Sequence, residues 1–307
     1  MEEQISIYHL EAAMSIRLKQ KQKNTMALIQ DYHKYIDVLM SLQESLAESK
    51  IQIPRYKLSL EPLLFKYTIS AKTYLNLLDG TKIITKLTQK KLSIVDVPTL
   101  YLLTRALIEN YLIFFYLYIQ EKDNESIIEY RNYIYEMSTL CFRQASPYMN
   151  EDEQNNKKMK EKEYIAFLEK KIKENPEFQK LADEKQKEVF NSPLDRKPAK
   201  LKSWKKLFEE SKLNDGDLYS VWRVFSNYSH SEFLSIMQLH NSKGNPEKTN
   251  FFIYQTLQIQ LQILAHFITE FSELFLCTQE RFQIEDEQTK AEIFMWNKMA
   301  TNKHIPK

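Results

Sequence analysis

Glycine is so scarce in this chain that folds which depend on it are poorly supplied. The sequence holds three glycines in 307 residues, about 1% where ordinary proteins carry about 7%. Hairpin-rich β folds need glycine at positions of positive φ, and phosphate-binding loops need it where the backbone approaches a phosphate. Gly80, Gly216 and Gly244 are too far apart to share a motif, so no Walker A or GxGxxG sequence is present. The commonest nucleotide-binding folds are therefore excluded.

The apolar residues recur at helical spacing along almost the whole chain, and strict alternation over a strand length is hard to find. This pattern predicts an all-α fold, an antiparallel multi-helix bundle with a charged helical insertion. We expect a single helical domain over 1–307. Its predicted parts are N-terminal amphipathic helices at 1–53, a core bundle from 59–150 and 214–280, the insertion at 151–212, and a C-terminal helix and tail at 281–307.

Several helix ends can be predicted from capping residues. Ser59, Asp96 and Asn124 are typical N-terminal caps, and Gly80 is a typical C-terminal stop. Long helices are predicted from about Asp217 to Leu239 and from Asn250 to about Glu280, with a last short helix after them.

The segment 151–212 differs from its surroundings in composition. It carries 31 charged residues among 62, against 84 in the whole chain. Tyr164, Phe167, Leu168 and Ile172 still form a helical stripe. We therefore expect a helical arm interrupted at Pro176, Pro193 and Pro198.

Charge and targeting features predict a cytoplasmic protein without a membrane partner. The net charge is +2, so no strong overall field favours nucleic acid or anionic lipid. The N-terminus lacks the basic and apolar regions of a signal peptide. Val97 to Ile119 is apolar enough to suggest a membrane span, but Arg105 and Glu109 near its middle favour a buried core helix.

Metal and cofactor sites are not expected. Cys141 and Cys277 are far apart and fit a role as small core residues, and the histidines form no HxxxH or HxxE pattern. We predict no metal ligands and no cofactor.

The most informative segment runs from Leu218 to Leu234. Arg223 and His230 are seven residues apart, about 20° around a helix, so both project from one face. Ser226 and Asn227 lie between them and Tyr219 begins the face, whereas Trp222, Phe225 and Phe233 point elsewhere. This stripe predicts a polar cleft, in which an imidazole moves a proton and a guanidinium holds a phosphate. A core histidine bonded to a neighbouring helix is the alternative.

Arg105 and Glu109 form the second candidate. They are four residues apart in the most apolar helix and can pair on one face. One interpretation is a core ion pair that fixes the helix register. The other is that Glu109 orients His230, or that Arg105 joins Arg223, in a shared cleft.

A basic segment is the third candidate. It carries six positive charges around Trp204 with no acidic residue between, which suits a phosphate backbone with the indole as a stacking platform. A solvated loop and helix start is the alternative. The cations are Arg196, Lys197, Lys200, Lys202, Lys205 and Lys206.

The two helical motifs carry a resemblance to known families. Arg105-Ala-Leu-Ile-Glu109 and Ser226-Asn-Tyr-Ser-His230 resemble the Arg-x-x-x-Glu and Ser-x-x-x-His helices of a bacterial all-helical family of unknown function, over roughly Leu60 to Glu280. More remotely, Arg223-x6-His230 is similar to the Arg-x4-6-His signature of the HEPN superfamily, which includes ribonuclease toxins and phage-defence effectors. That resemblance implies phosphate binding by Arg223, acid or base action by His230, and a site completed across a homodimer. Val224 departs from the Asn, Asp or His usual in the catalytic families.

The sequence thus favours a bacterial cytoplasmic HEPN-like protein, a metal-independent ribonuclease of a toxin or phage-defence system, with RNA and a second copy of the chain as partners. The alternative is a non-catalytic helical binding or scaffold protein whose Arg, Glu and His residues are structural.

Overall fold

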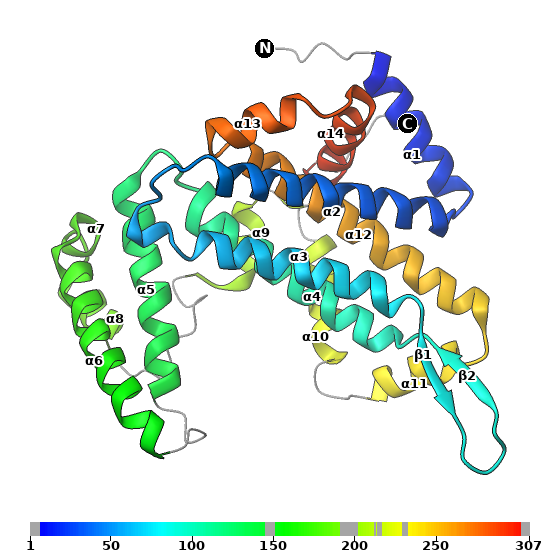
Figure 1. Cartoon of the computed structure of the whole chain (residues 1–307), viewed down its shortest axis with the longest axis horizontal. Helices are drawn as coiled ribbons and strands as arrows, with labels where there is room; N and C mark the ends of the chain where they lie inside the picture. The colour runs from blue at the N-terminus through cyan, green and yellow to red at the C-terminus, as the bar shows by residue number, and fades with distance from the viewer. Residues whose placement is uncertain are drawn as a thin grey trace. The chain divides into compact units, whose positions relative to one another are not determined.

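Helices make up nearly all of the regular structure in this protein (Figure 1). The computed structural model describes residues 7–144, 151–190, 202–211, 213, 217–228 and 233–301. Within these ranges the strands form one two-stranded antiparallel sheet, so the predicted all-α helical bundle is confirmed. In chain order the elements are α1 Ile7–Lys21, α2 Thr25–Glu48, the 3₁₀ turn η1 Arg55–Lys57, α3 Leu60–Leu77, β1 Thr81–Ile84, β2 Lys91–Ile94, α4 Val97–Phe114, the π-helical turn η2 Phe115–Ile119, α5 Glu125–Gln144, α6 Glu151–Glu174, α7 Pro176–Gln179, α8 Asp183–Phe190, α9 Trp204–Glu210, α10 Asp217–Asn227, α11 Phe233–Ser242, α12 Pro246–Ser272, α13 Leu276–Gln283 and α14 Glu287–Thr301.

The chain divides into two compact units. Unit 1 consists of Met1–Ile51, Glu61–Leu112 and Phe208–Lys307, and unit 2 consists of Gln52–Leu60 and Ile113–Leu207. Most of the charged segment 151–212 therefore belongs to unit 2, together with α5.

In unit 1 the long helix α12 packs against α2 and α14. The side chain of Asn245 accepts a hydrogen bond from the Lys248 amide at 3.0 Å and caps α12, with Pro246 in its first turn. The start predicted at Asn250 was therefore wrong by more than one turn, and so was the end at Glu280, because the helix stops at Ser272 and α13 follows. The core is rich in fully buried aromatic side chains, such as Tyr67, whose ring meets Phe267 edge-on at 4.6 Å.

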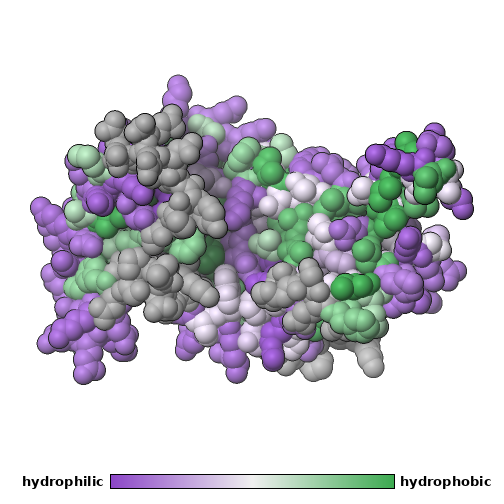
Figure 2. Space-filling model, turned by 90° about the horizontal axis from the view of Figure 1, so that it is seen from below, coloured by the Kyte–Doolittle hydropathy of each residue, from purple (hydrophilic) through white to green (hydrophobic). Residues whose placement is uncertain are grey.

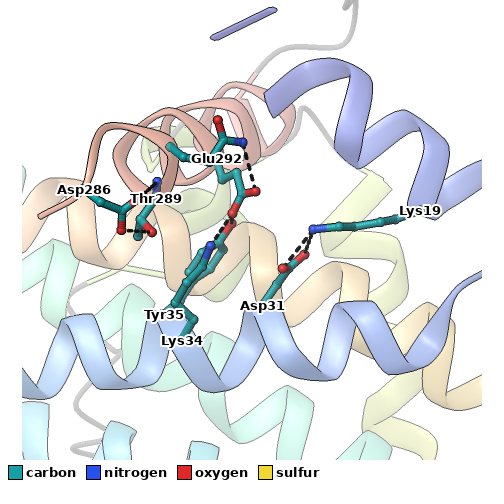
Figure 3. Close-up of polar contacts among 8 residues, drawn as sticks. Lys19, Asp31, Lys34, Tyr35, Asp286, Thr289 and Glu292 are labelled. Carbon is teal, nitrogen blue, oxygen red and sulfur yellow. Dashed lines mark hydrogen bonds and ion pairs between the residues drawn. The ribbon is translucent and has the colours of Figure 1, made fainter. Parts of the chain in front are cut away.

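Charged residues join the N-terminal helices to one another and to α14 (Figure 3). Lys19 Nζ on α1 lies 2.7 Å from Asp31 Oδ2 on α2, and Lys34 Nζ lies 2.5 Å from Glu292 Oε2 on α14. Burial raises the pKa of the Asp31 carboxyl, although the hydrogen bond from Lys19 opposes this. These contacts join α1 to α2 and α2 to α14, so they help to fix how the three helices pack.

In unit 2 the charged segment is not only a solvated arm, because α6 packs against α5. Leu168 and Ile172 of its predicted stripe are fully buried, in a core that also holds Met137 of α5. The break at Pro176 is confirmed, since α6 ends at Glu174 and Pro176 begins α7. Pro193 and Pro198 lie outside the described residues.

The predicted helix starts at Ser59, Asp96 and Asn124 can be compared with the hydrogen bonds that these side chains form. Asp96 Oδ1 accepts from the Thr99 amide at 3.2 Å, and Asn124 Oδ1 accepts from the Ile127 amide at 3.2 Å, so both caps are confirmed. Ser59 precedes α3 as predicted, but its hydroxyl forms side-chain hydrogen bonds within unit 2 instead, to Tyr118 at 2.7 Å and to Asn132 Oδ1 at 3.0 Å.

The β1–β2 hairpin was not predicted. It follows Gly80, which ends the α3 segment with a φ of +73°. Each strand has only four residues, and the turn contains no glycine or asparagine; Gln89 adopts the positive φ instead. The usual sequence signals of a hairpin are therefore missing.

The apolar segment Val97–Ile119 is long and apolar enough to cross a membrane by length and composition, but 72% of its most apolar window is buried inside the protein. Such burial is typical of the core helix of a soluble protein. The segment ends in η2, whose five residues are all buried.

Candidate functional site

The Arg105–Glu109 ion pair is formed on α4, as the four-residue spacing predicts. Arg105 Nε lies 2.7 Å from Glu109 Oε1, and the two side chains are 25% and 26% exposed. The pair is therefore neither sealed in the core nor free in solvent.

Trp222 on α10 completes this group. Its indole Nε1 donates a hydrogen bond to Glu109 Oε1 at 3.0 Å, and the Arg105 guanidinium carbon lies 5.4 Å from the centre of the indole ring. Glu109 thus ties α10 to α4 through one carboxylate oxygen. The sequence interpretation placed Trp222 away from the polar residues. The contact could have been anticipated from the chemistry of tryptophan, because a buried indole N–H needs a hydrogen-bond acceptor.

Aromatic packing holds α10 from its buried side. Tyr219 stacks on Trp222 with ring centres 5.8 Å apart, and Phe208 packs against both rings. Further along the helix, Phe225 stacks on Tyr101 of α4 at 4.5 Å. Burial raises the pKa of Tyr101 to about 12, so its hydroxyl stays protonated at neutral pH.

The opposite side of α10 is open. Arg223 is exposed and makes no hydrogen bond or ion pair within the part of the chain that the structure describes. Ser226 and Asn227 are half-buried, and the Ser226 hydroxyl donates to the Trp222 carbonyl at 2.9 Å. The sequence suggested that Arg223 is buried in a polar cleft. In the structure the buried side of α10 is aromatic, and Arg223 is accessible to solvent.

Several predicted site residues lie outside the described residues. They are His230, Arg196, Lys197 and Lys200. The pairing of His230 with Arg223, and its orientation by Glu109, stay predictions.

The described part of the basic segment begins α9 in unit 2. Lys202 Nζ donates to Gln120 Oε1 at 3.2 Å and lies 5.6 Å from the ring centre of Tyr116. Trp204 is half-buried, whereas Lys205 and Lys206 are exposed. Lys202 is thus already engaged by other residues of unit 2.

Among the described residues, no group of three or more His, Cys, Asp and Glu side chains is placed to hold a metal ion. The α10 site presents one exposed guanidinium, that of Arg223, on a helix whose buried side is anchored by Trp222 and Phe225. Such a group binds anions.

Comparison with known proteins identifies a helical protein that contains a domain of unknown function. The model of the Family of unknown function (DUF5677) matches residues 81–248, and the chain belongs to this family. The match includes the hairpin, the Arg105–Glu109 pair and α10. Searches of curated proteins and of solved structures found no match.

Proposed function

We propose that this protein is a HEPN-like metal-independent ribonuclease that binds RNA at the exposed face of α10. The observation that supports this most is the exposed guanidinium of Arg223, which lacks a protein partner in the described ranges. It extends from a helix whose other side is fixed by the hydrogen bond from Trp222 to Glu109. An accessible cation on an anchored helix suits phosphate binding better than a role in a structural ion pair.

The proposed chemistry needs only side chains of this chain and the RNA itself. The ribose 2′-hydroxyl attacks the adjacent phosphorus, the bond from phosphorus to the 5′-oxygen breaks, and a 2′,3′-cyclic phosphate and a 5′-hydroxyl form. His230 takes the 2′-proton, and an imidazole returns a proton to the leaving 5′-oxygen. Arg223 stabilises the extra negative charge on the phosphate in the transition state.

A homodimer completes this proposal. Cleavage needs a base and an acid at one phosphate, and two copies of His230, which follows α10 in the sequence, would supply two imidazoles. We propose this assembly for a bacterial cytoplasmic protein of a toxin or phage-defence system.

A non-catalytic binding protein is the second candidate, and exposed apolar side chains on α10 and α11 favour it. Phe233, Ile236 and Met237 on α11 are 72%, 60% and 40% exposed, and Val224 on α10 is 49% exposed. Such side chains are common at protein interfaces.

A cleavage assay separates the two candidates. The wild type is incubated with a mixed RNA pool in EDTA beside Arg223→Ala, His230→Ala and Lys243→Ala, an exposed charge in the turn after α11 that serves as control. We expect cleavage by the wild type and the control, and a loss of about 100-fold or more in the other two. Because Arg223 is exposed, its variant will fold, which circular dichroism checks. No cleavage by the wild type, or equal cleavage by Arg223→Ala, would contradict the proposal and favour the binding protein.

A further inference from the structure

The β1–β2 hairpin of unit 1 exposes aliphatic side chains that the helical core does not use. Ile83, Ile84 and Leu87 are 44%, 59% and 98% exposed. Since neighbouring strand residues point to opposite faces, Ile83 and Ile84 present apolar surface on both sides of the hairpin, and Leu87 lies in the turn. The hairpin extends beyond the ends of α3 and α4 (Figure 1).

The same hairpin is strongly basic. Lys82, Lys86, Lys90 and Lys91 are all exposed, and the sequence has no acidic residue from Gly80 to Val95. Figure 2 shows apolar and hydrophilic residues side by side at the right-hand end of the molecule, where the hairpin of Figure 1 lies. Lysines on an exposed strand edge also hinder pairing with other chains. That role does not account for a leucine that is 98% exposed at the turn.

The turn is held by its own hydrogen bonds. The Thr85 amide donates to the Lys90 carbonyl at 3.1 Å, the Gln89 amide donates to the Thr85 carbonyl at 2.9 Å, and the hydroxyls of Thr85 and Thr88 are 2.6 Å apart. Leu87 is therefore presented in a defined turn, with lysines on both sides of it.

We infer that this hairpin binds an anionic membrane surface. Leu87 and the two isoleucines enter the interface between headgroups and acyl chains, and the four lysines contact the negatively charged headgroups. Long lysine side chains suit this arrangement because their stems lie along apolar surface while the ammonium stays in water. The prediction of no membrane partner rested on the net charge of the whole chain and on the apolar segment Val97 to Ile119. The hairpin is a local cluster of positive charge, and it would bind a surface without crossing it.

The composition favours lipid over nucleic acid. Sites for single-stranded nucleic acid combine basic residues with aromatic side chains on which the bases stack, and arginine makes bidentate phosphate contacts that lysine does not. The segment from Gly80 to Val95 contains no aromatic residue and no arginine. This inference does not depend on the proposed ribonuclease function, because none of its residues lies on α10.

The test is cosedimentation of the full chain with vesicles of phosphatidylcholine alone and with vesicles that also contain phosphatidylserine. We expect binding to the second kind only. Each lysine near the surface contributes about fivefold to the affinity, so Lys86→Gln combined with Lys90→Gln will weaken binding by about 25-fold. Leu87→Ser will weaken it by about tenfold. All three residues are exposed, so these variants will fold.

Matched controls use exposed residues elsewhere. Leu276→Ser replaces a leucine that is 68% exposed, and Lys185→Gln with Lys187→Gln removes two exposed charges from α8. Both controls should bind as the wild type does. The inference is overturned if the wild type does not bind the anionic vesicles, or if hairpin and control variants bind equally. It is also overturned if the hairpin variants lose binding to an RNA in a gel-shift assay while vesicle binding is unchanged, because the hairpin would then be a nucleic-acid contact.

Discussion

The hydrogen bond between Trp222 and Glu109 should contribute more to stability than the ion pair beside it. The indole is buried and its acceptor is a carboxylate oxygen at 3.0 Å, whereas the Arg105 side chain is one-quarter exposed. Hydrogen bonds to charged groups contribute about 1.5–3 kcal/mol, and exposed ion pairs about 0–1 kcal/mol. Glu109→Ala, which removes both, should therefore lower the free energy of unfolding by about 2–3 kcal/mol, and Arg105→Gln by about 0.5 kcal/mol.

A double-mutant cycle isolates the hydrogen bond. Trp222→Phe keeps an aromatic ring on α10 but removes the donor, so its coupling to Glu109→Ala should be about 1.5 kcal/mol in urea unfolding followed by circular dichroism. Equal costs for Arg105→Gln and Glu109→Ala, or a coupling near zero, would refute the view that Glu109 anchors α10 to α4.

Three further predictions concern the fold. Tyr67→Phe should leave the free energy of unfolding unchanged or raise it, because the buried Tyr67 hydroxyl has no partner among the described residues. Tyr74→Phe removes a hydrogen bond to Thr256 and should lower the free energy of unfolding by about 1 kcal/mol, as measured by urea unfolding. Two hydrogen bonds from Thr289, of which the one from the side chain is the stronger, lower the pKa of Asp286. The ionised Asp286 therefore stabilises the folded state above its unfolded pKa of about 3.9, and this stabilisation is lost as the pH falls through the folded pKa. Urea midpoints should show Asp286→Ala less stable than the wild type at pH 7, with the difference closing in acid; a constant difference would contradict this. Gly80→Ala should destabilise more than Gly244→Ala in thermal melts, since both positions have positive φ but a Cβ at Gly80 would lie 2.9 Å from Ser93 Oγ, while nothing lies within 4 Å at Gly244; equal melting temperatures would contradict it.

Local features of the fold could be predicted from the sequence where one residue decides them. The caps at Asp96 and Asn124, the stop at Gly80 and the break at Pro176 act within one helical turn. The start of α12 was misassigned because two asparagines compete. The deciding signal was Pro246, which fits the first turn of a helix capped by Asn245.

Features that depend on the relative placement of helices could not be predicted. The Arg105–Glu109 pair follows from a spacing of four residues, but the bond from Trp222 to Glu109 joins residues 113 apart and depends on how α10 is rotated against α4. The hairpin was not predicted because its strands are short and the residue with positive φ in its turn is Gln89, a residue type that rarely occurs at such positions. The open face of α10 likewise depends on tertiary packing, which periodicity alone does not fix.

The central claim is that the exposed face of α10 acts on RNA without a metal, and the most direct measurement uses the substrate's own nucleophile. A short RNA and the same sequence with 2′-deoxyribose at every position are incubated in EDTA with the wild-type protein, and product ends are identified by mass spectrometry. The account predicts cleavage of the RNA alone, with 2′,3′-cyclic phosphate and 5′-hydroxyl ends. Cleavage of the deoxy substrate, products that carry 5′-phosphates, or an intact RNA would contradict it.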